Sequence, residues 1–178
     1  KVCLAPELRA GQPGTARASV FAVGAMLYEL VTGLSVGPGM RRPSEVVSSL
    51  PQNFEAVLAK ALVAEHPGDV LAQIEAACAH DYIGEEHVAI RYYDEAYRLG
   101  VPADQRRRFL VGYGSTLRNV GRIDDAVGVL GQAVADDPEY PAFAAFLALA
   151  LFSAGHPREA LATMLGCALD VSRPGAFE

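Results

Sequence analysis

The sequence has 178 residues but no tryptophan, and it contains only three cysteines. Cys3, Cys78 and Cys167 are odd in number and far apart along the chain. They therefore show neither the pattern of a disulfide framework nor the CxxC spacing of a zinc site. This use of cysteine favours a reducing, cytoplasmic setting.

Long apolar runs are also lacking. The longest, residues 142–152, is well short of the roughly 20 residues that a helix needs to cross a bilayer, so we expect no membrane span. No signal-peptide pattern opens the chain. The sequence starts Lys1-Val2-Cys3 without an initiator methionine, and we expect it to be a fragment of a longer chain.

A basic character is missing as well. The net charge is −6, which argues against nucleic acid and anionic membranes as partners, because a protein needs a basic surface to neutralise their phosphates. Residues 1–65 carry six basic and five acidic side chains, whereas residues 66–178 carry nine and sixteen. This change predicts a boundary near residue 66. With 51% hydrophobic residues, the chain can bury a core.

Two apolar segments in the first third predict helices. Residues 19–33 read SVFAVGAMLYELVTG, with Glu29 as the single charged side chain. They predict a helix that is buried on nearly all sides and stops at Gly33. Residues 51–62, PQNFEAVLAKAL, predict a second helix.

Residues 1–64 resemble the C-terminal lobe of a serine/threonine protein kinase. Ala5-Pro6-Glu7 matches the motif that closes the activation segment in that family, and residues 20–33 resemble the buried helix that follows it. Ser19 stands where the family has an aspartate. The glycine loop, strand lysine, HRD and DFG motifs are absent, so the resemblance implies no phosphoryl transfer by this chain. ATP and magnesium are expected only if an upstream kinase region exists.

Three explanations of this segment remain open: a truncated kinase fused to further helices, a decayed pseudokinase lobe, or an accidental resemblance. In each case about 60 residues of a larger lobe would leave apolar surface uncovered. We therefore expect the helices that follow to pack against it.

The last two thirds of the chain repeat. Gly84, Gly121 and Gly155 set the frame, separated by 37 and 34 residues. Short side chains, which let paired helices approach closely, recur in phase with these glycines. They are Ala77, Gly114 and Ala148 before the glycines, and Ala89, Ala126, Ala160, Ala96, Ala133 and Cys167 after them. Larger residues recur nine positions after each glycine, at Tyr93, Leu130 and Met164.

These positions resemble the tetratricopeptide repeat family over residues 69–170. The resemblance implies an all-α fold, an α-α superhelix of three helical hairpins over residues 67–172. A kinase-like helical remnant precedes it at residues 1–66, and a tail follows at residues 173–178. Asp69 and Asp104 are expected to cap helix starts, Pro138 to open a helix and Pro157 to lie in a first turn, and residues 100–103 are expected to form a loop.

In this family the first helix of each hairpin lines a concave groove that binds a partner peptide or helix. The resemblance therefore implies a non-catalytic protein-interaction module. The alternative is the C-terminal part of a serine/threonine protein kinase whose repeats regulate the lobe or recruit substrates. The side chains expected in the groove are Cys78, Asp81, Tyr82, Arg108, Ser115, Arg118, Asn119, Leu149, Phe152 and Ser153.

Arg108 and Arg118 are expected to contact a carboxylate or an acidic segment of the partner. The alternative is that both arginines are only solvated. Tyr82 and Phe152 are expected to add apolar contact. Chaperone binding is rejected, because Ile74 and Cys78 stand where the family's carboxylate clamp has a basic residue and an asparagine.

The last helix has leucines at four-residue spacing, at positions 161, 165 and 169. It is expected either to continue into further repeats or to make a dimer contact, through which the chain would self-associate.

No catalytic residue, cofactor or metal site is expected. The histidines at positions 66, 80, 87 and 156 do not share metal-ligand spacing on one helix, and none is placed to activate Ser115 or Cys78. Gly112-Tyr113-Gly114 lacks the third glycine and the preceding strand of a dinucleotide fingerprint. Arg106-Arg107-Arg108 is expected to be a solvated helix start.

Overall fold

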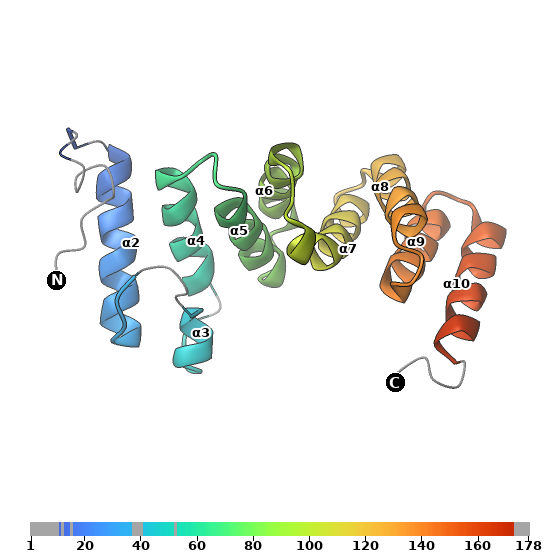
Figure 1. Cartoon of the computed structure of the whole chain (residues 1–178), viewed down its shortest axis with the longest axis horizontal. Coiled ribbons are helices and arrows are strands. Elements are labelled where there is room, and N and C mark those ends of the chain that lie inside the picture. The colour runs from blue at the N-terminus through green and yellow to red at the C-terminus, as the bar shows by residue number, and fades with distance from the viewer. Residues whose placement is uncertain (1–10, 12, 15, 37–40, 52, 173–178) are drawn as a thin grey trace. The chain divides into compact units, whose positions relative to one another are not determined.

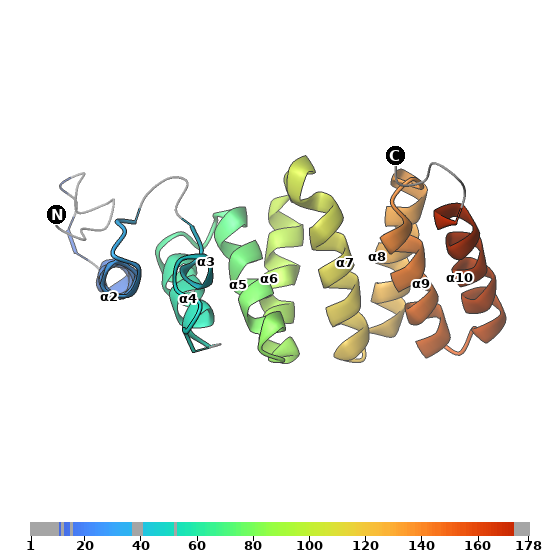
Figure 2. The ribbon, with the colours of Figure 1, turned by 90° about the horizontal axis from the view of Figure 1, so that it is seen from below.

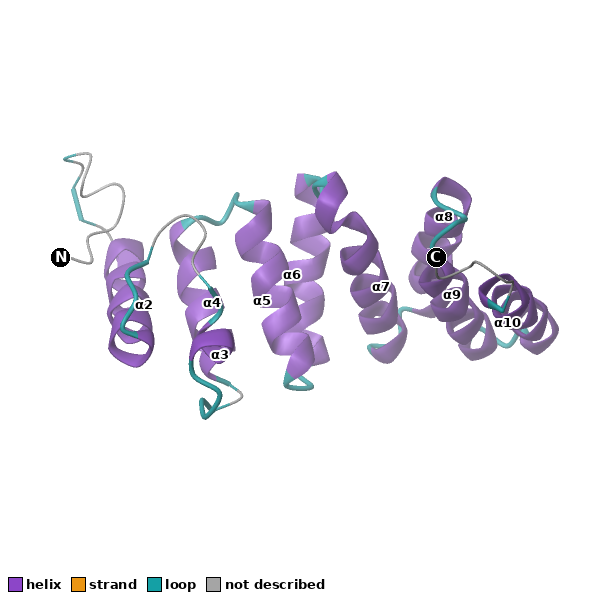
Figure 3. Ribbon diagram, turned by 60° about the horizontal axis from the view of Figure 1, so that its bottom comes forward, coloured by secondary structure: helices purple, strands orange, loops and turns teal. Residues whose placement is uncertain are grey.

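A computed structural model describes residues 11, 13–14, 16–36, 41–51 and 53–172 of the chain. These residues form nine helices and no strand, as Figure 3 shows, which confirms the predicted all-α fold. The chain divides into two compact units, residues 1–100 and residues 101–178, which are considered separately.

The described part of the first unit contains the helices α2 to α6, which Figure 1 labels along the chain. In it α2 packs on α4, α4 packs on α5, and α5 and α6 form a hairpin. Their bounds are α2 Ala16–Thr32, α3 Pro43–Val46, α4 Phe54–Glu65, α5 Val70–Tyr82 and α6 Glu86–Leu99.

The second unit contains two hairpins, α7 with α8 and α9 with α10. Helix α9 also packs on both α7 and α8, so the three helices share one core (Figure 2). Their bounds are α7 Ala103–Asn119, α8 Ile123–Asp136, α9 Pro141–Ser153 and α10 Pro157–Val171. The six helices predicted between residues 69 and 170 are therefore present.

Each hairpin turns at one of the three glycines that set the repeat frame. Gly84, Gly121 and Gly155 have φ angles of 79°, 85° and 83°, in the left-handed region that only glycine adopts readily. In each turn the N–H of the next residue donates to the carbonyl four residues before the glycine; Arg122 N–H, for example, donates to Leu117 at 2.9 Å. This is the Schellman arrangement, which satisfies carbonyls at the helix end.

The recurring small residues lie inside the hairpins, as predicted. Ala77, Ala89 and Ala126 are fully buried. The closest approach is at Gly114 in α7, where a Cβ atom would come within 2.5 Å of Leu130 Cγ in α8. Leu130 is itself buried, so α7 and α8 can nest at this distance only because position 114 has no side chain.

Two of the four predicted helix starts are wrong. Asp69 caps α5, accepting a hydrogen bond from Leu71 N–H at 2.9 Å, and Pro157 is in the first turn of α10. Asp104, however, lies inside the first turn of α7, whose N-cap is Pro102. Pro138 lies in the turn before α9, which begins at Pro141. Pro141, three residues later, fits a first turn as well as Pro138 does, and the sequence pattern did not show which of the two begins the helix.

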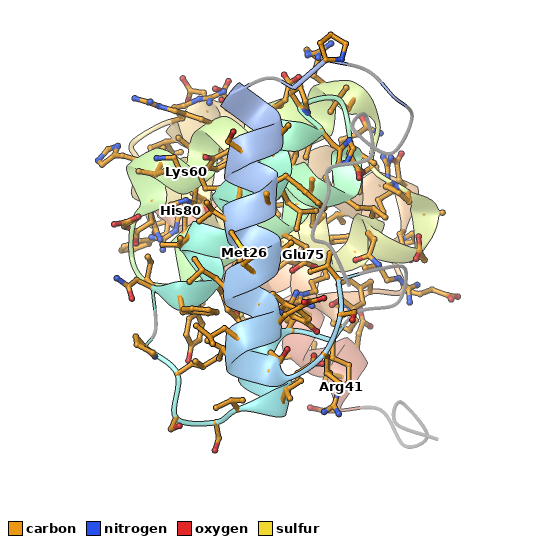
Figure 4. All side chains as sticks on the ribbon, turned by 90° about the vertical axis from the view of Figure 1, so that its left-hand side faces the viewer. Met26, Arg41, Lys60, Glu75 and His80 are labelled. Carbon is orange, nitrogen blue, oxygen red and sulfur yellow. The ribbon has the colours of Figure 1, made fainter. Side chains whose placement is uncertain are left out.

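The first third packs on the repeats through α4, as expected. Helices α2 and α4 approach closely at Gly24, where a Cβ atom would come within 2.8 Å of Ala61 Cβ. The expectation that α2 is buried on nearly all sides is wrong, because Leu30 is 81% exposed and Met26 is exposed too. Figure 4 looks onto this open face of α2 and labels Met26.

Ala5, Pro6 and Glu7, which carry the kinase motif, and the predicted tail at 173–178 lie outside the described residues. The kinase resemblance of residues 1–64 and the domain boundary at residue 66 stay predictions.

We predict that Gly114→Ala lowers the free energy of unfolding by about 1–3 kcal/mol, because the added methyl group overpacks the contact with Leu130. Urea unfolding followed by circular dichroism measures this. The control is Gly128→Ala in α8, where a Cβ meets nothing, and it should be neutral or gain up to about 1 kcal/mol from helix propensity. In a Leu130→Ala background the penalty of Gly114→Ala should disappear; an unchanged penalty would contradict this packing.

We predict that Gly121→Ala also destabilises the chain, by about 1–2 kcal/mol, because alanine pays a steric penalty at a φ of 85°. No atom lies within 4 Å of the added Cβ, so the cost is confined to the backbone. Gly131→Ala, inside α8 and equally uncrowded, is the matched control and should not destabilise. Equal stabilities of the two variants in urea unfolding would contradict the role of the turn.

Candidate functional site

The groove residues predicted from the sequence fall in both units. Asp81 and Tyr82 end helix α5 in the first unit. The others lie on two helices of the second unit that pack on each other, α7 and α9. They are Arg108, Ser115, Arg118, Asn119, Leu149, Phe152 and Ser153, while Cys78 lies on α5 with Asp81 and Tyr82.

Helix α7 presents a polar stripe outside its core. Arg108, Ser115 and Asn119 follow each other at seven and four residues, which places them on one face of a helix. Arg108 and Asn119 are exposed and Ser115 is half-buried. The opposite face of α7 is buried and contains Phe109, Leu110, Tyr113 and Leu117.

Helix α9 presents an apolar stripe. Leu149 is 43% exposed and Phe152, three residues later, is 68% exposed. Phe143, Ala148, Ala150 and Leu151 are buried, and the helix packs on α7, α8 and α10. Two large apolar side chains thus stand partly in solvent on a helix whose core face is already filled.

The two stripes face the same side, because their residues occupy equivalent repeat positions 34 residues apart. Ser115 corresponds to Leu149, and Arg118 corresponds to Phe152. We call this surface the α7–α9 face. The half-buried Val111 and Phe146 lie on it as well. They were missing from the prediction, although their spacing of four from Ser115 and three from Leu149 could have found them.

The two arginines of this face differ in their surroundings. Arg118 is half-buried; its Nη2 donates to Asn119 Oδ1 at 2.9 Å, and its Nε is buried with no hydrogen-bond partner among the described residues. Arg108 is exposed and forms no ion pair with any residue that the structure describes. Both guanidinium groups therefore retain donors for a carboxylate.

The 106–108 run is exposed in the first turns of α7, as expected of a solvated helix start, and two of its arginines form surface ion pairs. Arg106 pairs with Asp136 at 3.3 Å, and Arg107 donates twice to Asp137, at 2.7 and 3.0 Å. Hydrogen bonding to Arg107 lowers the pKa of Asp137 below its usual value. The guanidinium of Arg107 also lies 5.0 Å from the centre of the Tyr140 ring.

These pairs line a shallow cleft of about 360 Å³ between the start of α7 and the end of α8. Because both arginines already have carboxylate partners, the cleft carries no free positive charge that would hold an anion. Its floor is apolar, formed by Leu110, Ala133 and Phe143.

On α5, the predicted residues Asp81 and Tyr82 are in different environments. Tyr82 is 77% exposed. Asp81 accepts a hydrogen bond from the Tyr93 hydroxyl at 3.3 Å, and Cys78 Sγ lies 3.9 Å from the same hydroxyl. Burial and the nearby Cys78 and Asp81 raise the pKa of Tyr93. Asp81 therefore helps to hold the α5–α6 hairpin together.

His80 is buried at the position where the other repeats have Leu117 and Leu151. Its Nδ1 lies 2.7 Å from Glu85 Oε2, across the turn, and its ring stacks on Tyr92 with centroids 5.4 Å apart. The histidine thus joins the two helices of its hairpin.

The described residues contain no group of three or more His, Cys, Asp or Glu side chains suited to hold a metal ion. In the same part of the chain no helix is both long and apolar enough to span a membrane.

Comparison with known proteins gives one family match. A family model described as a tetratrico peptide repeat matches residues 70–172. No curated protein matches the chain. The matched region contains the helices α5 to α10, with their turn glycines and buried small residues in phase. Since it covers more than half of the 178 residues, the chain belongs to the tetratrico peptide repeat family.

Proposed function

We propose that this chain is a non-catalytic scaffold that binds a partner peptide or helix on the α7–α9 face. The family to which it belongs binds protein partners. The observation that carries the proposal is the exposure of Phe152 and Leu149 beside Arg108 and Arg118 on two helices of one core. Apolar anchors with charged neighbours are typical of sites where a few residues supply most of the binding energy.

The chemistry of the face favours a partner segment with both acidic and apolar side chains. Arg108 and Arg118 are its positive residues, and Asp104, one turn before Arg108, is a negative one at its edge. The chain as a whole carries a charge of −6, so an acidic segment would be repelled elsewhere and attracted to this patch at short range. Leu149 and Phe152 would take apolar side chains of the same segment.

The chain would act in a reducing, cytoplasmic setting, for which the unoxidised thiols of Cys78 and Cys167 are suited. Self-association is a second proposed contact, and it involves α10, whose residues are outside the α7–α9 face.

We predict that peptides selected by the full chain from a random phage-displayed library are enriched in Asp and Glu next to Leu or Phe. Arg108→Ala and Arg118→Ala should each weaken binding of a selected peptide about threefold to tenfold, because an exposed charge-assisted contact contributes about 1 kcal/mol. Phe152→Ala should weaken it as much or more. Fluorescence anisotropy at two salt concentrations measures all three effects.

The matched control is Arg91→Ala, which removes an exposed arginine from α6 in the other unit and should leave peptide binding unchanged. Circular dichroism checks that every variant keeps its helices. Selected peptides without acidic residues would contradict the acidic part of the proposal. Peptides whose affinity ignores all three substitutions on the α7–α9 face would contradict the site.

A further inference from the structure

Helix α10 has a row of leucines that stay exposed among the described residues of the second unit. Leu161, Leu165 and Leu169 are 60%, 55% and 68% exposed. The helix packs on α9 through its opposite side, where Ala160 is buried. Three large apolar residues in one row form a contiguous patch, which differs from the isolated apolar residues that ordinary protein surfaces carry.

The preceding hairpin shows what covers the corresponding surface of a repeat. Helix α8 occupies the same repeat position as α10, and α9 packs along it. The surface of α10 is therefore of a kind that this fold covers with another helix.

The pattern on α10 reads the same in both directions from Leu165. Leu161 and Leu169 lie four residues to either side of it, and the exposed Ala162 and Ala168 lie three residues to either side. In a two-fold contact between identical helices, a residue at a given distance before the centre meets the residue at the same distance after it. Leucine would then meet leucine, and alanine would meet alanine, whose small size allows close approach.

We propose that two copies of this chain associate through α10, antiparallel about a two-fold axis at Leu165. Leu165 then contacts Leu165 of the second copy, and Leu161 contacts its Leu169. An antiparallel pair also brings the positive end of each helix dipole to the negative end of the other. One helix face is smaller than the about 800 Å² per partner of a standard interface, so we expect a dissociation constant on the order of micromolar.

Sedimentation equilibrium of the full chain tests the association, at protein concentrations from roughly 1 to 100 times that dissociation constant. We expect a monomer–dimer equilibrium, loss of the dimer in Leu165→Glu, and an intact dimer in Leu149→Glu, which changes an exposed leucine on α9. Because Leu165→Glu lies outside the α7–α9 face, it should leave peptide binding unchanged, so failure of this proposal and failure of the proposed function are distinguishable. A chain that stays monomeric throughout, or a dimer that survives Leu165→Glu, overturns the proposal.

Disulfide trapping tests the antiparallel geometry. In a background with alanine at all three native cysteines and unchanged circular dichroism, Leu165→Cys should form a cross-linked dimer on oxidation. Leu161→Cys and Leu169→Cys should each remain largely uncross-linked alone but link to each other when mixed. Efficient self-linking of Leu161→Cys would indicate parallel helices and would overturn the two-fold arrangement.

Discussion

The close contact between small residues on one helix and a large residue on the next is the constraint on which each hairpin depends. It is tightest at Gly114 and Leu130, where the absence of a side chain lets α7 and α8 nest. The equivalent positions Ala77 and Ala148 are also buried. A helix with larger residues there would stand further from its partner. Helix α9 could then no longer pack on both α7 and α8.

That nesting also decides which side chains are free to act. Once α7 has used Leu110, Tyr113 and Leu117 in the core, its remaining stripe is polar and faces outward. Helix α9 is different, because it is apolar on almost every side. With its core face filled, the surplus apolar residues Leu149 and Phe152 are left in solvent. These exposed side chains add little to the stability of the fold. They would add binding energy in contact with a second molecule.

Several charged residues of the described structure form ion pairs between helices. Arg42 pairs with Glu75 at 2.8 Å between α3 and α5, and the pKa of Arg42 is raised because this contact outweighs the opposing effect of burial. Arg106 and Arg107 connect α7 with α8 in the same way. Arg108 and Arg118 do not pair with acidic side chains in the described structure, which separates them from the structural charges.

Much of the fold could be predicted from the sequence. The repeat frame located the hairpins, because turn glycines and small residues must return in phase when identical units stack. The resemblance to the repeat family gave the fold, and helical spacing placed Arg108, Ser115 and Phe152 outside the core. Helix starts were less certain, as Pro138 and Asp104 show, because several neighbouring residues can occupy a first turn equally well.

The sequence by itself determined the all-α fold, the hairpin turns and the periodic core, since each follows from local backbone preference and from side-chain size at fixed spacing. Only the tertiary structure decided that Arg107 pairs with Asp137, that His80 meets Glu85, and that α2 keeps an open face. These facts depend on the distance and rotation between neighbouring helices. Both are set by the packing of many side chains at once, and no single spacing in the chain encodes them.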